Sequence, residues 1–284
     1  MPLPTLRDLV DAGAQFGHQR SRTYPTAKQF TYALRERVYV IDLEKTLSGL
    51  DHAAKMMEAL ATQGKQVIFV GTKQQAIGPV KAAAEATGMS FINHRWLGGT
   101  LTNFDTLRRN IEKLDRLEEV INSPQADEFT KQERGRIKKQ IAKLDKNFQG
   151  LRNLKKLPDA LVVIDVNHEK IAIAEANDLG IPVIALVDTD ANPALISHVI
   201  PGNDDSRKTI EIVLNVMIEA IKAGQKAAPL KQAAPQAPTA EPVIVDEVVE
   251  VTEQAPVTET VTPKKAAVKK PAAKKVTKKA VSNE

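Results

Sequence analysis

The stretch Ala160-Leu161-Val162-Val163-Ile164-Asp165 decides the fold class of this chain. Its apolar residues follow one another without polar alternation, which is typical of a strand buried on both faces of a sheet. Residues 168–179 have the pattern of a helix that ends at Gly180, and Pro182 opens a second apolar run over 183–187. This order of strand, helix and strand predicts a parallel β-sheet.

The segments before and after this unit extend the same alternation. Further strands are indicated by short apolar runs at 38–41, 66–71 and 91–92. Helices are indicated by apolar residues at helical spacing in 43–63, in 72–87 and beyond Asp204-Asp205. Apolar strands that each precede a helix predict a doubly wound fold of the α/β class, and we expect it to form one domain over residues 1–228.

A long charged insertion interrupts this alternation at residues 104–156. Apolar residues recur there in steps of three and four, first over 104–121 and again over 137–151, with Pro124 between the two runs. Thr102 and Asp105 have the spacing of a capping box that would start the first helix. Two narrow apolar seams joined by a turn predict an inserted antiparallel coiled-coil hairpin that projects from the domain. The alternative is an ordinary pair of helices lying on the sheet.

The composition changes abruptly at Pro229. Residues 229–284 contain seven Pro and no aromatic residue, with an acidic block at 241–259 and eight lysines in four pairs at 264–279. Such a segment cannot bury enough apolar surface to offset its ordering entropy, so we predict a disordered C-terminal tail. The paired lysines suit weak, salt-sensitive contacts with phosphates, but a solubilising tail without a partner fits the same composition.

Charge is distributed unevenly along the chain although the net charge is only +5. Residues 1–156 hold 26 Lys and Arg against 17 Asp and Glu, whereas residues 157–228 hold 5 against 11. This asymmetry favours a protein with one face turned toward a polyanion, although solvated helix faces produce the same pattern by accident. The absence of Cys excludes disulfides and thiolate chemistry. No signal segment and no apolar run of 18 residues is present, so we expect a cytoplasmic protein.

Catalytic, cofactor and metal sites of open α/β sheets lie at the ends of the strands. Val70-Gly71-Thr72-Lys73 is a weak phosphate-loop candidate that also fits a tight turn, and no Gly-rich dinucleotide or P-loop motif is present. Asp165, Asp188 and Asp190 follow strands with His168 nearby, but such residues also make good helix caps and turns. The five His show no metal-ligand spacing. We predict no catalytic residue, no cofactor and no metal ligand.

Two segments combine basic, aromatic and turn-forming residues, a composition that suits contact with looped or single-stranded RNA. The first runs over 17–39 and interleaves arginines and a lysine with Phe and Tyr, whose rings have the alternative role of anchoring the segment in the core. The second, 93–103, holds Trp96 beside Arg95 and two glycines that let backbones approach closely. Trp96 taken alone is more typical of a core residue.

These segments resemble the bacterial small-subunit ribosomal protein S-two family, in the family's order across residues 5–222. The motifs that carry the resemblance are Gly17-His18, 41–46, 69–76, 158–160, Ile164-Asp165, Arg95-Trp96-Leu97-Gly98-Gly99-Thr100-Leu101-Thr102-Asn103 and Ile200-Pro201-Gly202-Asn203-Asp204-Asp205. The resemblance implies a flavodoxin-like sheet with an inserted coiled coil and no catalytic activity. It also implies attachment to ribosomal RNA between the head and body of the small subunit. Where the family usually carries Trp-Asn-Pro-Lys, this chain has Tyr24-Pro25-Thr26-Ala27-Lys28.

The residues and the resemblance together lead us to expect a structural constituent of the small ribosomal subunit that supports translation. Its expected partners are small-subunit ribosomal RNA and neighbouring ribosomal proteins, including the large first protein of that subunit, with no membrane and no small-molecule substrate. The residues expected to contact RNA are Gly17, His18, Arg20, Arg22, Lys28, Arg35, Arg37, Lys73, Arg95, Trp96, Gly98, Gly99, Asn103, Arg108 and Arg109. The alternative is an enzyme acting on a nucleotide or sugar phosphate, with Lys73 and the strand-end aspartates as its site.

Overall fold

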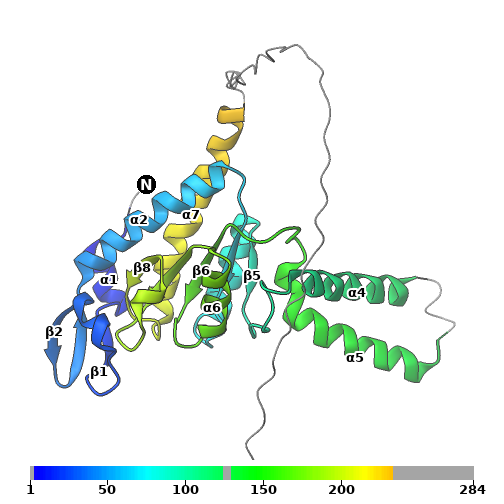
Figure 1. The fold of residues 1–284 in the computed structure, drawn as a ribbon, viewed down its shortest axis with the longest axis horizontal. Helices are drawn as coiled ribbons and strands as arrows, with labels where there is room; N and C mark the ends of the chain where they lie inside the picture. The colour runs from blue at the N-terminus through cyan, green and yellow to red at the C-terminus, as the bar shows by residue number, and fades with distance from the viewer. Residues whose placement is uncertain (1–2, 124–128, 233–284) are drawn as a thin grey trace, which may run out of the picture. The chain divides into compact units, whose positions relative to one another are not determined.

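A five-stranded parallel sheet forms the centre of the protein (Figure 1). The computed structural model describes residues 3–123 and 129–232, which lie within one compact unit. The sheet order is β5–β4–β6–β7–β8, and counted along the chain this is 2-1-3-4-5, a common order of doubly wound sheets. The predicted α/β class is confirmed. The strands are β4 (Val67–Val70), β5 (Ser90–Ile92), β6 (Ala160–Ile164), β7 (Val183–Val187) and β8 (His198–Pro201).

Helices cover both faces of this sheet, which explains its unbroken apolar strands. Along β4, Val67 and Phe69 belong to one hydrophobic cluster, whereas Ile68 and Val70 belong to a second one on the opposite face. The first cluster is closed by α2 (Leu43–Thr62), α3 (Ile77–Thr87) and α7 (Arg207–Gln232), and the second by α6 (Lys170–Asp178). A strand with two buried faces needs apolar side chains at every position, so it cannot alternate.

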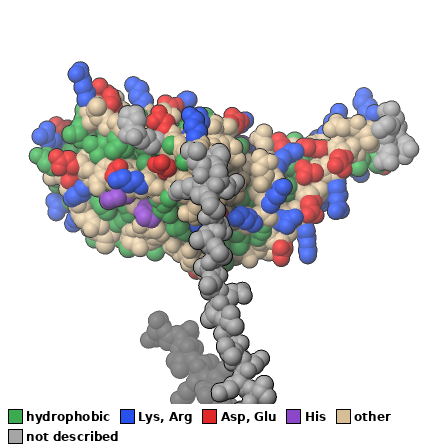
Figure 2. Space-filling view, turned by 90° about the horizontal axis from the view of Figure 1, so that it is seen from above, with side chains coloured by type: hydrophobic (Ala, Val, Ile, Leu, Met, Phe, Trp, Pro, Cys, Tyr) green, Lys and Arg blue, Asp and Glu red, His purple; other side chains and the backbone are tan. Residues whose placement is uncertain are grey.

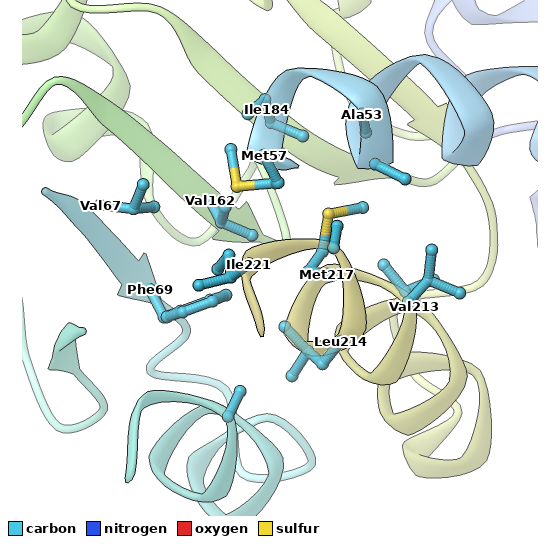
Figure 3. Packing of buried hydrophobic residues seen from close by; sticks show 14 of the residues in the cluster. Ala53, Met57, Val67, Phe69, Val162, Ile184, Val213, Leu214, Met217 and Ile221 are labelled. Carbon is cyan, nitrogen blue, oxygen red and sulfur yellow. The ribbon is translucent and has the colours of Figure 1, made fainter. Parts of the chain in front are cut away.

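The first cluster is packed mainly by two long helices that lie side by side, α2 and α7 (Figure 3). Met57 of α2 and Met217 of α7 are fully buried against the sheet, where they meet Phe69 and Val162. Unbranched methionine side chains fill irregular gaps between two helices and a twisted sheet well. Within the described residues, no helix is both long enough and apolar enough to cross a membrane.

A separate small antiparallel sheet precedes α2. It has the order β1–β3–β2, and its elements are β1 (Phe16–Gln19), the 3-10 helix η1 (Pro25–Phe30), β2 (Thr31–Arg35) and β3 (Val38–Ile41). The predicted strand at 38–41 therefore exists, but its placement in the parallel sheet was wrong. Only Ile41 of β3 is buried, and a four-residue apolar run does not reveal whether its partners are parallel or antiparallel.

Two helices occupy the insertion, α4 (Phe104–Asn122) and α5 (Lys131–Phe148), followed by the 3-10 helix η3 (Gln149–Leu151). They pack against each other beyond the β5 edge of the sheet (Figure 1). Their ends nearest the sheet join its second cluster, through Leu107 and Leu114 of α4 and Phe148 of α5. No residue of α4 after Leu114 is buried within the described part of the chain. The connection around Pro124 lies outside the described residues.

The start of α4 differs from its prediction. Asn103 is the N-cap and its side chain makes no capping hydrogen bond, so the predicted capping box of Thr102 and Asp105 is wrong. The hydroxyl and amide of Thr102 donate instead to a buried carboxylate of α6, which competes for the same groups. A capping box does start α5, where Thr130 and Glu133 bond each other's backbone amides.

Several boundaries also shift. The helix α1 (Leu6–Ala12), the 3-10 helix η4 (Pro193–Leu195) and strand β8 were not predicted. The helix predicted over 72–87 begins only at Ile77, because Thr72 before it bonds the N-cap of α6 and Lys73 bonds Asp204 after β8. At the other end, α7 runs to Gln232 and so passes the predicted tail boundary at Pro229. The rest of the predicted tail, 233–284, lies outside the described residues.

Candidate nucleic-acid interface

The carboxyl ends of β4, β6 and β8 bring Lys73 together with three aspartates. The ammonium Nζ lies 2.6 Å from Asp204 Oδ1, 2.6 Å from Asp205 Oδ1 and 3.2 Å from Asp165 Oδ2. Burial acts to lower the pKa of Lys73, but hydrogen bonds to Asp204 and Asp205 outweigh it and raise that pKa above the usual lysine value. Lys73 is thus charged but neutralised inside the protein, and only 17% of its side chain is exposed.

The phosphate-loop candidate is a tight turn in which the hydrogen-bond donors of Thr72 already bond a carboxylate of the protein. The backbone amide of Thr72 donates to Glu169 Oε1 at 2.9 Å, and the Thr72 hydroxyl bonds the same carboxylate. A phosphate there would need these donors and would also meet the aspartates around Lys73. The geometry therefore favours the turn, and it offers the alternative enzyme no phosphate site at these residues.

Of the three strand-end aspartates, Asp165 serves as a cap. Asp165 Oδ1 accepts a hydrogen bond of 2.9 Å from the backbone amide of His168, and Asp165 adopts a left-handed φ of 69°. Asn192 likewise accepts from the amide of Ala194 in the turn after β7. The capping interpretation of Asp165 is confirmed, although the same side chain also pairs with Lys73.

His18 points inward, toward the end of β7. Its Nδ1 lies 3.1 Å from Asp188 Oδ1, and its Nε2 lies 3.8 Å from Asp190 Oδ2. The Asp188 carboxylate raises the pKa of His18 to about 9, against a smaller opposing effect of burial. The expected RNA contacts His18 and Lys73 are therefore both engaged with the protein's own carboxylates.

The small antiparallel sheet presents the cations that face solvent. We call residues 16–41, which form β1, η1, β2 and β3, the basic module. All five of its predicted contact cations are exposed, and none of them pairs with a carboxylate in the described part of the chain; they are Arg20, Arg22, Lys28, Arg35 and Arg37. The amide of Arg20 donates to the carbonyl of Arg37 at 2.9 Å, and both residues line a depression with Gln19 and Ser21.

Aromatic rings accompany these cations on the surface. Tyr32 on β2 is 78% exposed, Phe16 on β1 is 56% exposed and Tyr24 is 40% exposed. Phe30 and Tyr39 are half-buried. The alternative in which the rings anchor the segment in the core therefore does not hold for the first three. Exposed rings beside unpaired arginines can stack on bases while the arginines meet phosphates.

Short backbone contacts fasten the basic module to the main sheet. The amide of His18 donates to Thr189 Oγ1 and the amide of Tyr24 donates to the Thr189 carbonyl, both at 2.8 Å. Gly17 passes so close that a Cβ there would lie 2.7 Å from Thr189 Cγ2 and 3.0 Å from the Tyr39 carbonyl. Glycine is required at this position by the close approach of two chain segments.

The Trp-containing segment folds around the buried carboxylate of Glu175 on α6. Trp96 Nε1 donates to Glu175 Oε1 at 3.0 Å and the Gly99 amide at 2.8 Å, while the Leu101 amide donates to Oε2 at 2.9 Å. The Trp96 side chain is buried, as the core alternative expected, so only its neighbours face solvent. The exposed neighbours are Arg95, Gly98 and Asn103, and Gly99 is half-buried.

Cations of α4 lie next to this segment. Arg108 and Arg109 are exposed, and Arg108 makes a long, 3.9 Å ion pair with Glu112. Basic and acidic side chains are interspersed over α4 and α5 in the view of Figure 2, without one sign dominating that face. The base of the hairpin is held by Arg152, which binds Glu118 in a bidentate pair at 2.6 and 2.7 Å and Asp145 at 2.8 Å.

Sequence reasoning missed the residues that fasten these surfaces in place: Thr189, Glu175 and Arg152. Glu175 had a detectable signal, because it is an acid on the same face of α6 as buried Ala172 and Ala176. An acid at an apolar position usually needs several donors. Thr189 and Arg152 had no comparable signal, because their partners are distant in sequence.

The fold and these surfaces describe an α/β protein in which strand-end carboxylates pair with Lys73 and His18, while a basic, aromatic module is exposed. Residues 9–224 match the family described as ribosomal protein S2. The chain is 44% identical to the small ribosomal subunit protein uS2 of Helicobacter acinonychis over 222 residues, which cover 78% of this chain and 90% of the relative. It is 43% identical to that of Thermus thermophilus over 217 residues, with coverages of 76% and 85%. The protein of Helicobacter pylori is 44% identical over 222 residues, with coverages of 78% and 84%.

The chain belongs to the ribosomal protein S2 family, and it is not an enzyme. This membership confirms the resemblance inferred from the motifs, because the matched region contains all of them.

Proposed function

We propose that this chain is a structural constituent of the small ribosomal subunit that binds ribosomal RNA through the basic module. One observation carries the proposal: the basic module holds five exposed cations, which pair with no carboxylate of the described residues, together with three exposed aromatic rings. The relatives are small ribosomal subunit proteins, so ribosomal RNA is the polyanion that we expect these cations to contact. The cations His18 and Lys73, which are engaged inside the protein, are not part of the proposed contact surface.

The cations and exposed rings of the module suit RNA with loops and bulges better than a regular double helix. Each Arg that meets a phosphate releases condensed counterions, so affinity falls with salt. Exposed rings bind unstacked bases, which occur in loops and bulges of RNA. The module is short and is fastened to the sheet at Thr189, so its cations are held in place before binding rather than ordered during it.

A second contact surface is proposed at the segment around Arg95 and the start of α4, where Arg95, Arg108 and Arg109 are exposed. We assign the two helices that follow to an antiparallel coiled-coil arm. The support is the stepped apolar spacing of α5, where Ile141 and Leu144 are half-buried, and the Arg152 clamp at its base. Such an arm would reach further RNA or protein neighbours in the subunit.

Protein neighbours are part of the proposal. Leu6 and Val10 are both nearly half exposed and lie one helical turn apart on α1, which suits contact with another protein. We assign this contact to other small-subunit proteins, including the large first protein of the subunit. The RNA-binding role is assigned to residues 1–228, and none is assigned to 229–284.

Removing the cations of the basic module tests the proposal. In the full-length protein, Arg20, Arg22, Arg35 and Arg37 are replaced by Ala together, and binding to small-subunit RNA is measured by filter binding from 50 to 300 mM salt. We expect affinity to fall at least tenfold at low salt, because most of the arginines that would neutralise phosphates are gone. The slope of log K against log salt should fall by about 0.7–0.9 for each phosphate that the variant no longer neutralises.

A matched variant removes four exposed cations from α6 and α7, at Lys170, Lys208, Lys222 and Lys226. Its net charge equals that of the first variant, so general electrostatic attraction is reduced equally. If both variants lose the same affinity and the same salt slope, RNA does not bind at the module. Sedimentation with small subunits from cells that express each variant gives the corresponding result for the assembled particle.

A further inference from the structure

A recess lies at the base of the hairpin, beside the Trp-containing segment. Its volume is about 130 Å³, and it is bounded by residues 97–100, the first turns of α4 and the end of α5. Leu97, Leu107 and Phe148 supply apolar walls. A cavity of about 150 Å³ takes one benzene ring, so this recess has room for a single planar ring and for little more.

Polar side chains along α4 complete the lining of the recess, and they have no protein partner. The Asn103 side chain does not cap the helix, and neither Thr106 nor Asn110 makes a side-chain hydrogen bond within the described residues. A carboxamide presents one acceptor and two donors in a plane. The edge of a nucleobase also presents donors and acceptors in the plane of its ring, so a carboxamide can bond it at two atoms.

Glycine at position 98 keeps one side of the recess clear. A Cβ added to Gly98 would meet no atom within 4 Å, and its φ is not in the left-handed region. Its neighbour Gly99 differs, because it has a φ of 88° and a Cβ there would lie 3.3 Å from Asn103 Cβ. Backbone conformation therefore favours glycine at 99 but not at 98, where a side chain would occupy the open space beside the recess.

Cations flank the recess on the surface. Arg109 and Lys113 follow Thr106 and Asn110 by three positions each, so they lie on the adjoining side of α4. Both are exposed, as is Arg95 before the loop, and none of the three pairs with a carboxylate in the described part of the chain. A nucleotide whose base enters the recess has phosphates on both sides of it, and these cations are placed to meet them.

We propose that this recess binds one unstacked nucleobase of the ribosomal RNA. The apolar walls remove the faces of the ring from water, while Asn103 and Asn110 contact its edge. Arg109 and Lys113 bind the flanking phosphates. The inference rests on the second contact surface proposed above, and it names the part of the RNA that this surface takes. A base in a loop or bulge is free to leave the stack, whereas a base inside a regular helix is not.

Chemical probing of small-subunit RNA bound to the full-length protein tests the proposal. Dimethyl sulfate, kethoxal and a carbodiimide together report the base edges of every nucleotide type, whereas hydroxyl radicals report the backbone. We expect the wild type to protect one unpaired base from its reagent, and Gly98→Leu to remove that protection. Affinity for the RNA should fall about fivefold or more, as for the loss of one stacked base. Backbone protections that depend on the arginines of the basic module should remain.

Two further variants complete the experiment. Asn110→Leu keeps a side chain of similar size but lacks the carboxamide, and it should weaken the same protection. Gly78→Leu on α3 is the matched control, because a Cβ there also meets no atom within 4 Å and its φ is not left-handed. It should leave every protection unchanged. Circular dichroism identifies a variant that fails to fold, and if Gly98→Leu does so, Asn110→Leu carries the test.

The base and backbone readouts separate this inference from the proposed function. If the folded variants at 98 and 110 keep every base protection of the wild type, the recess does not bind a nucleobase. Backbone protections that persist in that case leave the RNA-binding role of the basic module intact. If the wild type protects neither bases nor backbone, both proposals are overturned.

Discussion

At the scale of single residues, Glu175 shows how one buried carboxylate organises a loop that has little regular structure of its own. The loop supplies an indole N–H and several backbone amides, all of which need acceptors once they leave water. Burial acts to raise the pKa of Glu175, but the hydrogen bonds from Trp96 and from the Leu101 and Gly99 amides hold that pKa below its usual value. The ionised carboxylate is therefore the form that the fold selects.

Replacing Glu175 with Gln is expected to lower the free energy of unfolding by about 2 kcal/mol at pH 7, because a charged acceptor of several hydrogen bonds becomes neutral and one of its acceptor atoms becomes a donor. Urea unfolding followed by tryptophan fluorescence measures the change directly, since Trp96 is the single Trp and contacts this carboxylate. Asp178→Asn, on the exposed side of the same helix, should change the free energy of unfolding by less than about 0.5 kcal/mol.

The same carboxylate predicts the direction of a pH effect. The pKa of Glu175 is lower in the folded protein than its unfolded value of 4.5, so its stabilisation is complete above that value and is lost as pH falls through the folded pKa. The difference in stability between wild type and Glu175→Gln should consequently shrink below about pH 4.5. A difference that stays constant down to pH 3 would contradict this assignment.

The sequence shows which residues of the candidate site carry a positive charge, but it does not show which of them face solvent. The motif residues Lys73 and His18 have the chemistry of phosphate ligands, yet both are consumed by aspartates that come from other strand ends. Sequence shows that a cation is present but not whether an acid from a distant segment will neutralise it. Trp96 has the same ambiguity, and Glu175 resolves it in favour of the core.

At the scale of elements, the hairpin of α4 and α5 depends on contacts at its base. Arg152 follows α5 and binds Glu118 on α4 and Asp145 on α5, so one guanidinium bridges both helices. The hydrogen bond to Glu118 raises the pKa of Arg152 above its usual value, in keeping with a bidentate pair. By contrast, the pair of Arg116 with Glu112 is long, at 4.0 Å, and lies on a single exposed helix.

Arg152→Ala should lower the free energy of unfolding by about 1–2 kcal/mol, and a double-mutant cycle with Glu118→Gln should give a coupling near 1 kcal/mol. The matched cycle of Arg116→Ala and Glu112→Gln should give less than about 0.5 kcal/mol, because exposed pairs are screened. Thermal unfolding by circular dichroism at low and high salt provides both values. Equal couplings in the two cycles would show that the Arg152 clamp has no special role.

Elements differed in how well they were predicted. The strands β4, β6 and β7 carry four or five consecutive buried apolar residues, and such runs are unambiguous when a helix follows. By contrast, β1 and β2 are half exposed and carry polar residues, so their composition resembled a turn-rich loop. Their structure comes from pairing with β3, which follows both of them in the chain, and composition does not encode which strands pair.

At the scale of the whole molecule, stability should be distributed unevenly. The sheet and its two clusters hold most of the buried apolar residues, whereas α4 beyond Leu114 and α5 before Phe148 hold none in the described structure. Regions with few buried apolar side chains open locally at a free energy lower than that of global unfolding. The basic module is intermediate, because Ile41 and Ala27 are buried in it but its cations and several of its rings are exposed.

Hydrogen exchange should therefore protect the amides of β6 and β7 at the level of global unfolding. The amides of 115–122 and 131–140 should exchange by local opening, at least a hundredfold faster. Mass spectrometry of peptic fragments resolves these segments within one experiment, and the sheet fragments act as the internal control. Protection of the distal hairpin equal to that of β6 would show that the helices unfold only together with the sheet.

Local pattern was sufficient for the parallel sheet, for the helical hairpin and for the family. Each of these depends on the spacing of apolar residues or on contiguous motifs. Both are properties of residues that are near one another in the sequence. Tertiary structure decided which cations face solvent, where β3 pairs, and that His18 meets Asp188 and Asp190. The pairing of β3 depends on two other short strands of the same module. The fate of the cations His18 and Lys73 depends on contacts between segments more than a hundred residues apart, where desolvation and pairing of charges are set by the folded geometry rather than by neighbours in the chain.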